Sequence, residues 1–167
     1  GTVDRQDGRT HLVAIHHRRE LADGTKRFSW HGPDGRAGLG GVAVVDLPLY
    51  GSELVASWPP DAIIVVTEGE KAADALLGID SHAVATVTGA STAPAAGPLE
   101  VLRGRHVLLW PDADAPGRDH MRKVALRIAA VAETVKWLEP PPDVPPGWDA
   151  ADAFADGRDP ATVKAEM

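Results

Sequence analysis

The chain has 167 residues, a hydrophobic fraction of 44% and a formal net charge of −7 at pH 7. Its length suits one domain with its own core, and the absence of cysteine excludes a disulfide scaffold, a thiolate zinc site and a cysteine nucleophile. No apolar run approaches the ~18 residues that a membrane helix needs, and the polar first ten residues are unlike a signal peptide, so we expect a cytoplasmic protein. The acidic balance does not indicate a nucleic-acid-binding surface, although short basic runs occur at 16–19, 26–27, 103–106 and 118–123.

The first part of the chain is rich in strand-like segments. Residues 10–19 and 25–32 are β-rich runs, and Asp23-Gly24 between them is a strong hairpin signal. Pro59-Pro60 closes this part of the chain. We therefore assign residues 1–59 to a small N-terminal β-rich extension.

After residue 60, strand-like and helix-like segments alternate. Strands are expected at 62–67, 82–88, 106–110 and 134–139, and helices at 70–78, 99–104, 116–132 and 148–157. The first of these strands is a continuous β-branched run, which is typical of a strand buried on both faces. The alternation predicts an α/β fold with a mainly parallel sheet of about four strands, flanked by helices. We assign this core to residues 60–157 and a C-terminal tail to 158–167.

Acidic residues follow two of the predicted strands. Glu68-Gly69 comes directly after AIIVVT, and Asp112 and Asp114 follow HVLLW. Ligands of open α/β sheets bind at the carboxyl ends of the strands, and residues two apart in an extended segment point to the same side. Asp112 and Asp114 could therefore bind one cation together, and their oxygen ligands favour Mg²⁺ or Mn²⁺ over zinc. The amides near Gly117, which open the next helix, could meet a phosphate there.

Each of these motifs alone also has an ordinary structural explanation. Pairs such as Asp112 and Asp114 are often solvated turn residues or helix caps, and Gly89 after the second strand fits a simple turn. Their combination favours a functional site, because the acidic motifs and Gly89 follow three separate strands of one predicted sheet.

Three segments together resemble the motifs of the Toprim domain. They are IIVVTEGEKAADAL, AVATVTGAS and VLLWPDADAPGRDHM, and the resemblance covers about residues 60–157. Toprim domains occur in DnaG-type primases, type IA and type II topoisomerases and OLD-family nucleases. The segments EGEKAADAL, PDADAPG and GWDAADAF are similar to those of phage and plasmid primases and primase–helicases. The resemblance implies a Rossmann-like Toprim fold and a DNA primase of a phage or mobile element, which synthesises RNA primers on single-stranded DNA.

The resemblance also implies roles for the matching residues. Glu68, Asp112 and Asp114 would be catalytic and would hold Mg²⁺, with Mn²⁺ possible, and Glu68 could be a general base, a general acid or a further ligand. Asp149 and Asp152 could add a contact, although Asp149 equally fits a helix N-cap. Contacts to phosphate or nucleic acid are expected from Gly69, Lys71, Gly89, Gly117, Arg118 and Lys123.

The implied partners are single-stranded DNA, nucleoside triphosphates and a helicase or zinc-binding domain expected outside this chain, with no membrane. Many primase-like sequences carry an acidic residue where this chain has Ala72. This departure argues against robust catalysis by the chain alone. The alternatives are therefore a metal-dependent nuclease and a non-catalytic module that binds a metal or a partner. A flavodoxin-like receiver or hydrolase domain fits the motif placement less well.

The histidine and tryptophan residues carry weaker signals. No spacing among the histidines, His120 included, suggests a metal site. We interpret the tryptophans as core or interdomain anchors rather than base-stacking residues; they are Trp30, Trp58, Trp110, Trp137 and Trp148.

Overall fold

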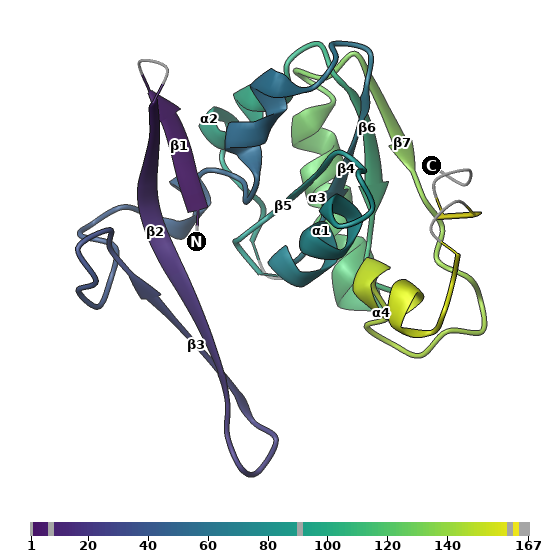
Figure 1. Ribbon diagram of the computed structural model, residues 1–167, viewed down its shortest axis with the longest axis horizontal. Helices are drawn as coiled ribbons and strands as arrows, with labels where there is room; N and C mark the ends of the chain where they lie inside the picture. Colours follow the sequence, from purple (N-terminus) through teal and green to yellow (C-terminus); the bar gives the residue numbers. More distant parts are fainter. Residues whose placement is uncertain (1, 7–8, 90–91, 160–161, 164–167) are drawn as a thin grey trace.

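The computed structural model describes residues 2–6, 9–89, 92–159 and 162–163. Figure 1 shows an antiparallel sheet beside a parallel sheet that is flanked by helices. The strands are β1 Thr2–Gln6, β2 Arg9–Glu20, β3 Lys26–His31, β4 Ile63–Thr67, β5 Ala83–Ala85, β6 His106–Trp110 and β7 Thr134–Trp137. The helices are α1 Glu70–Leu77, α2 Ala96–Leu99, α3 Ala115–Ile128 and α4 Ala150–Ala155, with 3₁₀ turns η1 Val44–Asp46, η2 Ser52–Ser57 and η3 Glu100–Leu102.

The parallel sheet confirms the predicted fold class. Its strand order is β5-β4-β6-β7, and all three pairings are parallel. In the register of β4 and β6, Thr67 pairs with Trp110, while Thr67 also pairs with Ala85 of β5. The three strands therefore end level with one another, and the residues that follow them are brought to one edge of the sheet.

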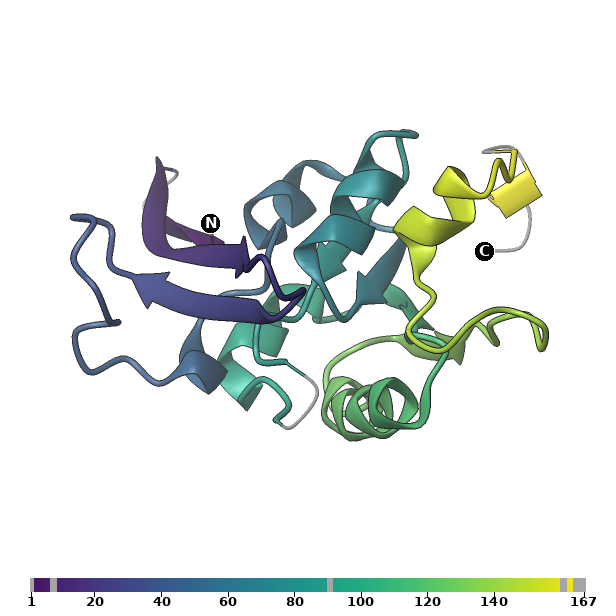
Figure 2. The ribbon, with the colours of Figure 1, turned by 90° about the horizontal axis from the view of Figure 1, so that it is seen from below.

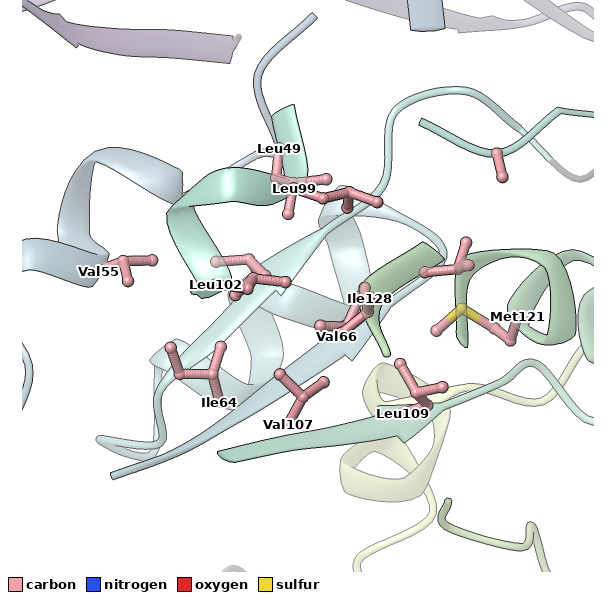
Figure 3. Close-up of a cluster of buried hydrophobic side chains, with 13 residues drawn as sticks. Leu49, Val55, Ile64, Val66, Leu99, Leu102, Val107, Leu109, Met121 and Ile128 are labelled. Atoms are coloured by element: carbon pink, nitrogen blue, oxygen red, sulfur yellow. The ribbon is translucent and has the colours of Figure 1, made fainter. Parts of the chain in front are cut away.

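Alternating side chains of the sheet enter two apolar layers. On one face, Ile64, Val66 and Leu109 pack with Met121 and Ile128 of α3, and Figure 3 shows this cluster. On the other face, β4 and β6 pack against α1 and α4. Figure 2 shows α3 on the side of the sheet opposite to α1 and α4. Burial on both faces explains why the strand segments read as continuous apolar runs rather than as alternating ones.

Several elements are shorter than the sequence pattern predicted. The strand expected over 82–88 ends at Ala85, and the helix expected over 116–132 ends at Ile128. The helical hydrogen bonds give way to a turn in which the Val131 N–H donates to Ile128 O, and Val131 O accepts from the Gly104 N–H. The apolar spacing continues past the helix because this turn still packs against the core.

The N-terminal extension forms a three-stranded sheet of order β1-β2-β3. The hairpin of β2 and β3 was expected, whereas β1 was not. The segment between this sheet and β4 also contributes to the parallel sheet: Leu49 and Val55 are buried in the core, and Tyr50 forms an antiparallel bridge with Ala85. The assignment of residues 1–59, 60–157 and 158–167 to separate regions stays a prediction.

Among the helices in the described part of the chain, none combines the length and apolar character needed to cross a membrane.

Candidate active site

Glu68 lies at the mouth of β4, where two threonine hydroxyls fix the surrounding backbone. The Thr67 hydroxyl donates to Gly69 O at 3.1 Å, and the Thr86 hydroxyl donates to Glu68 O at 3.1 Å. Both threonines are buried. The turn from β4 into α1 is thus tied to the end of β5, which holds the Glu68 side chain at the edge of the sheet.

Asp112 lies beside Glu68 at the end of β6. Its backbone N–H donates to Glu68 Oε1 at 3.0 Å, so the two predicted motifs are in direct contact. Gly117 makes this contact possible. An ideal Cβ on Gly117 would collide with Glu68 Oε1 and would lie 2.9 Å from Asp112 Cβ. The glycine after the D-x-D motif therefore provides space for the pair of carboxylates.

Asp114 has the geometry of a helix N-cap. Its Oδ1 accepts from the Gly117 N–H at 2.7 Å, and Asp114 is the residue that precedes α3. Its Oδ2 faces the loop after β7, because an ideal Cβ on Gly147 would lie 3.6 Å from it. One oxygen thus holds the helix start, and the other is directed towards the segment that leads into α4.

The carboxylates of this edge strongly influence one another. The pKa of Asp112 is raised to about 8, first by burial and then by Glu68, Asp149, Asp114 and Asp152 in that order of strength. The pKa of Glu68 is also raised, first by burial and then by Asp114 and Asp149, against the opposing hydrogen bond from Asp112 N–H. Such a concentration of partly desolvated negative charge is typical of functional sites.

Asp149 and Asp152 join this cluster from α4. The Asp149 carboxylate accepts from the N–H groups of Ala151 and Asp152, and Asp152 Oδ2 accepts in return from the Asp149 N–H. This is a capping box, so the N-cap reading of Asp149 is confirmed. Lys71 Nζ lies 2.9 Å from Asp152 Oδ1 and therefore joins α1 to α4. Among the described residues, no three Asp, Glu or His side chains are already arranged to hold one ion together.

Asp149→Ala is expected to lower the free energy of unfolding by about 1 kcal/mol, because the carboxylate that accepts from the Ala151 and Asp152 N–H groups is lost. Asp149→Asn keeps an acceptor at this position and should retain most of the stability. Urea denaturation of the two variants beside the parent checks this. An equal loss of unfolding free energy in both variants would contradict the capping role and would show that the negative charge of Asp149 is what stabilises the fold.

The Glu68 backbone is also supported by a residue that its sequence motif does not include. His120 of α3 is fully buried, and its Nε2 lies 2.9 Å from Thr86 Oγ1. Because the Thr86 hydroxyl donates its only proton to Glu68 O, it must accept from His120 Nε2–H. Burial, and after it Lys123, lowers the pKa of His120 to about 4, so the ring is neutral at pH 7 and carries its one proton on Nε2. Only the apolar spacing of α3, which places residue 120 beside Met121 and Val124 on the inner side, could have indicated it.

The other predicted residues lie on the loops and helices that follow the strands. Gly69 is the N-cap of α1, Gly89 has a left-handed φ of 67° in the loop after β5, and Arg118 and Lys123 lie on α3, where Lys123 is exposed.

Ala72 is 2% exposed and packs in the layer between the sheet and α4. The position that is acidic in many primases is thus part of an apolar contact here. Trp110 and Trp148 are core residues, as expected of them.

Several solved structures with a similar fold are primases. No family model and no curated protein matches the chain. The primase domain of bacteriophage T7 gp4, in a complex of the T7 lagging-strand DNA polymerase with an RNA/DNA hybrid and dTTP, is 22% identical with a TM-score of 0.58. That similarity extends over 98% of this chain and 80% of that chain. The primase of Aquifex aeolicus is 18% identical with a TM-score of 0.62, over 98% of this chain and 38% of that one.

A DnaG primase catalytic domain bound to single-stranded DNA is 17% identical with a TM-score of 0.60, over 99% of this chain and 57% of that one. The chain has the Toprim fold of DnaG-type primases. Identities this low establish the Toprim fold alone, and the chain spans well under two thirds of both DnaG-type chains described here.

Proposed function

We propose that this protein is a metal-dependent nucleotidyltransferase of the primase type, which joins ribonucleotides on a single-stranded DNA template. The observation that carries the proposal is the contact between Glu68 and Asp112 on a primase-like fold, with Asp114 two residues further on as the N-cap of α3. An origin in a phage or mobile element is part of the same proposal and rests on the sequence resemblance.

The donor set suits Mg²⁺ or Mn²⁺. Glu68, Asp112 and Asp114 offer only oxygen ligands, and the oxygens not occupied by the hydrogen bonds described above are available to a cation. The pKa of Asp112 is raised first by burial and then by the neighbouring carboxylates, and a bound cation would offset both effects. A bound divalent ion would neutralise phosphate charge and lower the pKa of the attacking hydroxyl.

The chain's own residues account for the rest of the reaction. The ribose 3′-oxygen would attack the α-phosphorus of a nucleoside triphosphate, the new P–O bond would form as the Pα–O–Pβ bond breaks, and pyrophosphate would leave. Glu68 would take the hydroxyl proton, since its raised pKa makes it a better base than an ordinary carboxylate. Thr86 and His120 would hold the Glu68 backbone in position, and Gly117 would leave room for its side chain.

The test is to incubate the full chain with single-stranded DNA, labelled ribonucleotides and Mg²⁺ or Mn²⁺. A ladder of short RNA that disappears in Asp112→Asn/Asp114→Asn would support the proposal. Asparagine is also a good N-cap, so this double variant removes charge while keeping the start of α3. Asp119→Asn is the matched control, because Asp119 lies on the same helix and pairs with Arg122.

Other outcomes would assign the site differently. Loss of the DNA without ribonucleotides, by the parent and not by the double variant, would indicate a nuclease. Absence of both products, with Mn²⁺ binding that the double variant lacks, would indicate a module that binds metal without chemistry. Either result would overturn the proposed polymerising activity.

A further inference from the structure

The hairpin of β2 and β3 carries a row of aromatic rings on one face. His16 stacks on Trp30 at a centroid distance of 4.2 Å and an interplanar angle of 10°, and on Phe28 at 5.3 Å and 24°. Phe28 is 57% exposed, although large aromatic side chains usually find cover in a folded protein. The row therefore has a ring at one end whose surface is open to further stacking.

A pocket of about 420 Å³ lies along this row. The three rings line one side of it, and the loop after β5 and the residues around η1 line the other. Its volume falls within the ~300–1,000 Å³ typical of small-ligand pockets. Thr88 lies in its wall, and the Thr88 hydroxyl is buried without a hydrogen-bond partner among the described residues. The pocket thus combines stacking surfaces with a polar group that has unused hydrogen-bonding capacity.

The pocket adjoins the carboxylate edge. His16 Nδ1 lies 3.7 Å from Glu70 Oε2, and Glu70 comes two residues after Glu68. On the opposite wall, Thr88 and Gly89 follow Thr86, which holds the Glu68 backbone. A molecule in the pocket would therefore lie next to the proposed reaction site.

The rim of the pocket supplies positive charge that the carboxylate edge lacks. Arg18 is exposed and pairs across the hairpin with Phe28, so both side chains project from the same face of the sheet. Arg18 is also close enough to Lys71 of α1 to repel it. A chain of phosphates that crosses this face would meet Arg18 while its bases reach the rings.

We propose that this aromatic pocket, formed by His16, Phe28, Trp30 and Thr88, binds a nucleobase of single-stranded DNA by stacking. The inference rests on the proposed function for its choice of ligand. Single strands expose the faces of their bases, and alternating rings and arginines are the usual means of binding them without reading sequence. A duplex hides its base faces, and a bare anion would not use the rings.

The test measures binding of the full chain to a fluorescently labelled dT oligonucleotide by anisotropy, without divalent ions, so that no chemistry takes place. Stacking on an aromatic ring contributes substantially to the binding of a single strand, so Phe28→Ala should weaken binding roughly tenfold. Phe28→Trp should retain the affinity, which separates stacking from a structural role. Leu126→Ala, at a residue of α3 that is 79% exposed, is the matched control and should bind like the parent.

An oligonucleotide with abasic sites supplies the second arm. It should bind the parent at least as weakly as dT binds Phe28→Ala, because His16 and Trp30 lose their stacking partner too, and Phe28→Ala should not weaken binding of the abasic strand further. No binding of dT by the parent, equal binding by Phe28→Ala and Leu126→Ala, or a Phe28→Ala effect that persists on the abasic strand would each overturn the inference.

The outcomes separate this inference from the proposed function. Stacking-dependent binding by a protein that makes no RNA would leave the pocket in place and remove the polymerising activity. RNA synthesis by a protein whose DNA affinity does not depend on Phe28 would support the polymerising activity and overturn the stacking pocket.

Discussion

Asp112→Asn is expected to stabilise the metal-free protein at pH 9 while lowering its activity by a factor of ~1,000 or more. Charge stabilisation worth several kcal/mol in the transition state would be lost with the carboxylate. The same carboxylate is unfavourable in the folded protein, because burial and neighbouring acidic groups raise its pKa from 3.8 to about 8. A group that the proposed reaction needs is therefore one that the resting fold tolerates poorly.

The pH dependence follows from the direction of this pKa shift. Between pH 3.8 and about 8, the folded state keeps a proton on Asp112 that the unfolded state has released. The contribution of Asp112 to the free energy of unfolding is therefore fully present below pH 3.8 and is lost as the pH rises to about 8. Asparagine removes this loss, and we expect a gain of roughly 1–3 kcal/mol at pH 9, less than the full shift because the carboxyl is partly solvated.

Urea denaturation in EDTA at pH 5 and pH 9 measures the effect. The difference between Asp112→Asn and the parent should grow from pH 5 to pH 9, whereas Asp119→Asn should show no such growth. A difference that is the same at both pH values would mean that the Asp112 carboxyl ionises normally in the folded protein.

Gly117→Ala is expected to lower activity about 100-fold with the α3 N-cap intact. The added methyl group would occupy the space of Glu68 Oε1 and crowd Asp112 Cβ, so the two carboxylates would have to separate. A displacement of ~1 Å at reacting groups can reduce the rate by about this factor, and overpacking of a tight site lowers stability by ~1–3 kcal/mol. The Gly117 N–H that bonds Asp114 is kept in alanine, so the effect is not one of lost capping.

Gly97→Ala is the matched control for Gly117→Ala. Gly97 lies in α2, where an added Cβ meets no atom within 4 Å, and alanine there should slightly stabilise the helix. Primer synthesis and thermal unfolding of both variants check the prediction. Full activity in Gly117→Ala would show that the contact between Glu68 and Asp112 is not required.

The sequence predicted the parallel sheet and the meeting of its acidic motifs for a simple reason. Runs of β-branched residues mark strands buried on both faces, and level strand ends bring Glu68 and Asp112 together wherever the strands are neighbours in the sheet. The one-residue spacing of Asp112 and Asp114 predicted a shared side. In the structure, Asp114 Oδ1 instead accepts from the Gly117 N–H at the start of α3, and Oδ2 is left for a ligand.

What the sequence could not supply were contacts between distant segments that carry no local signature. Thr86 and His120 look like ordinary strand and helix residues, and only the packing of α3 against the sheet links them to Glu68. Likewise, the pairing of Lys71 with Asp152 depends on α4 lying beside α1, which no periodicity reveals. Trp30 was interpreted as a core or interdomain anchor, and nothing in the sequence indicated that the same hairpin leaves Phe28 57% exposed.

The bridge between Tyr50 and Ala85 has a consequence for how the protein behaves at high concentration. β5 is the outermost strand on its side of the parallel sheet, and exposed outermost strands invite the sheets of other molecules to add on. Tyr50 occupies backbone groups of Ala85 with two hydrogen bonds of 2.9 and 3.0 Å, and an ideal Cβ on the buried Gly51 would lie only 3.1 Å from Ala83 O. The chain thereby covers its own strand edge, which protects the sheet from intermolecular extension and aggregation.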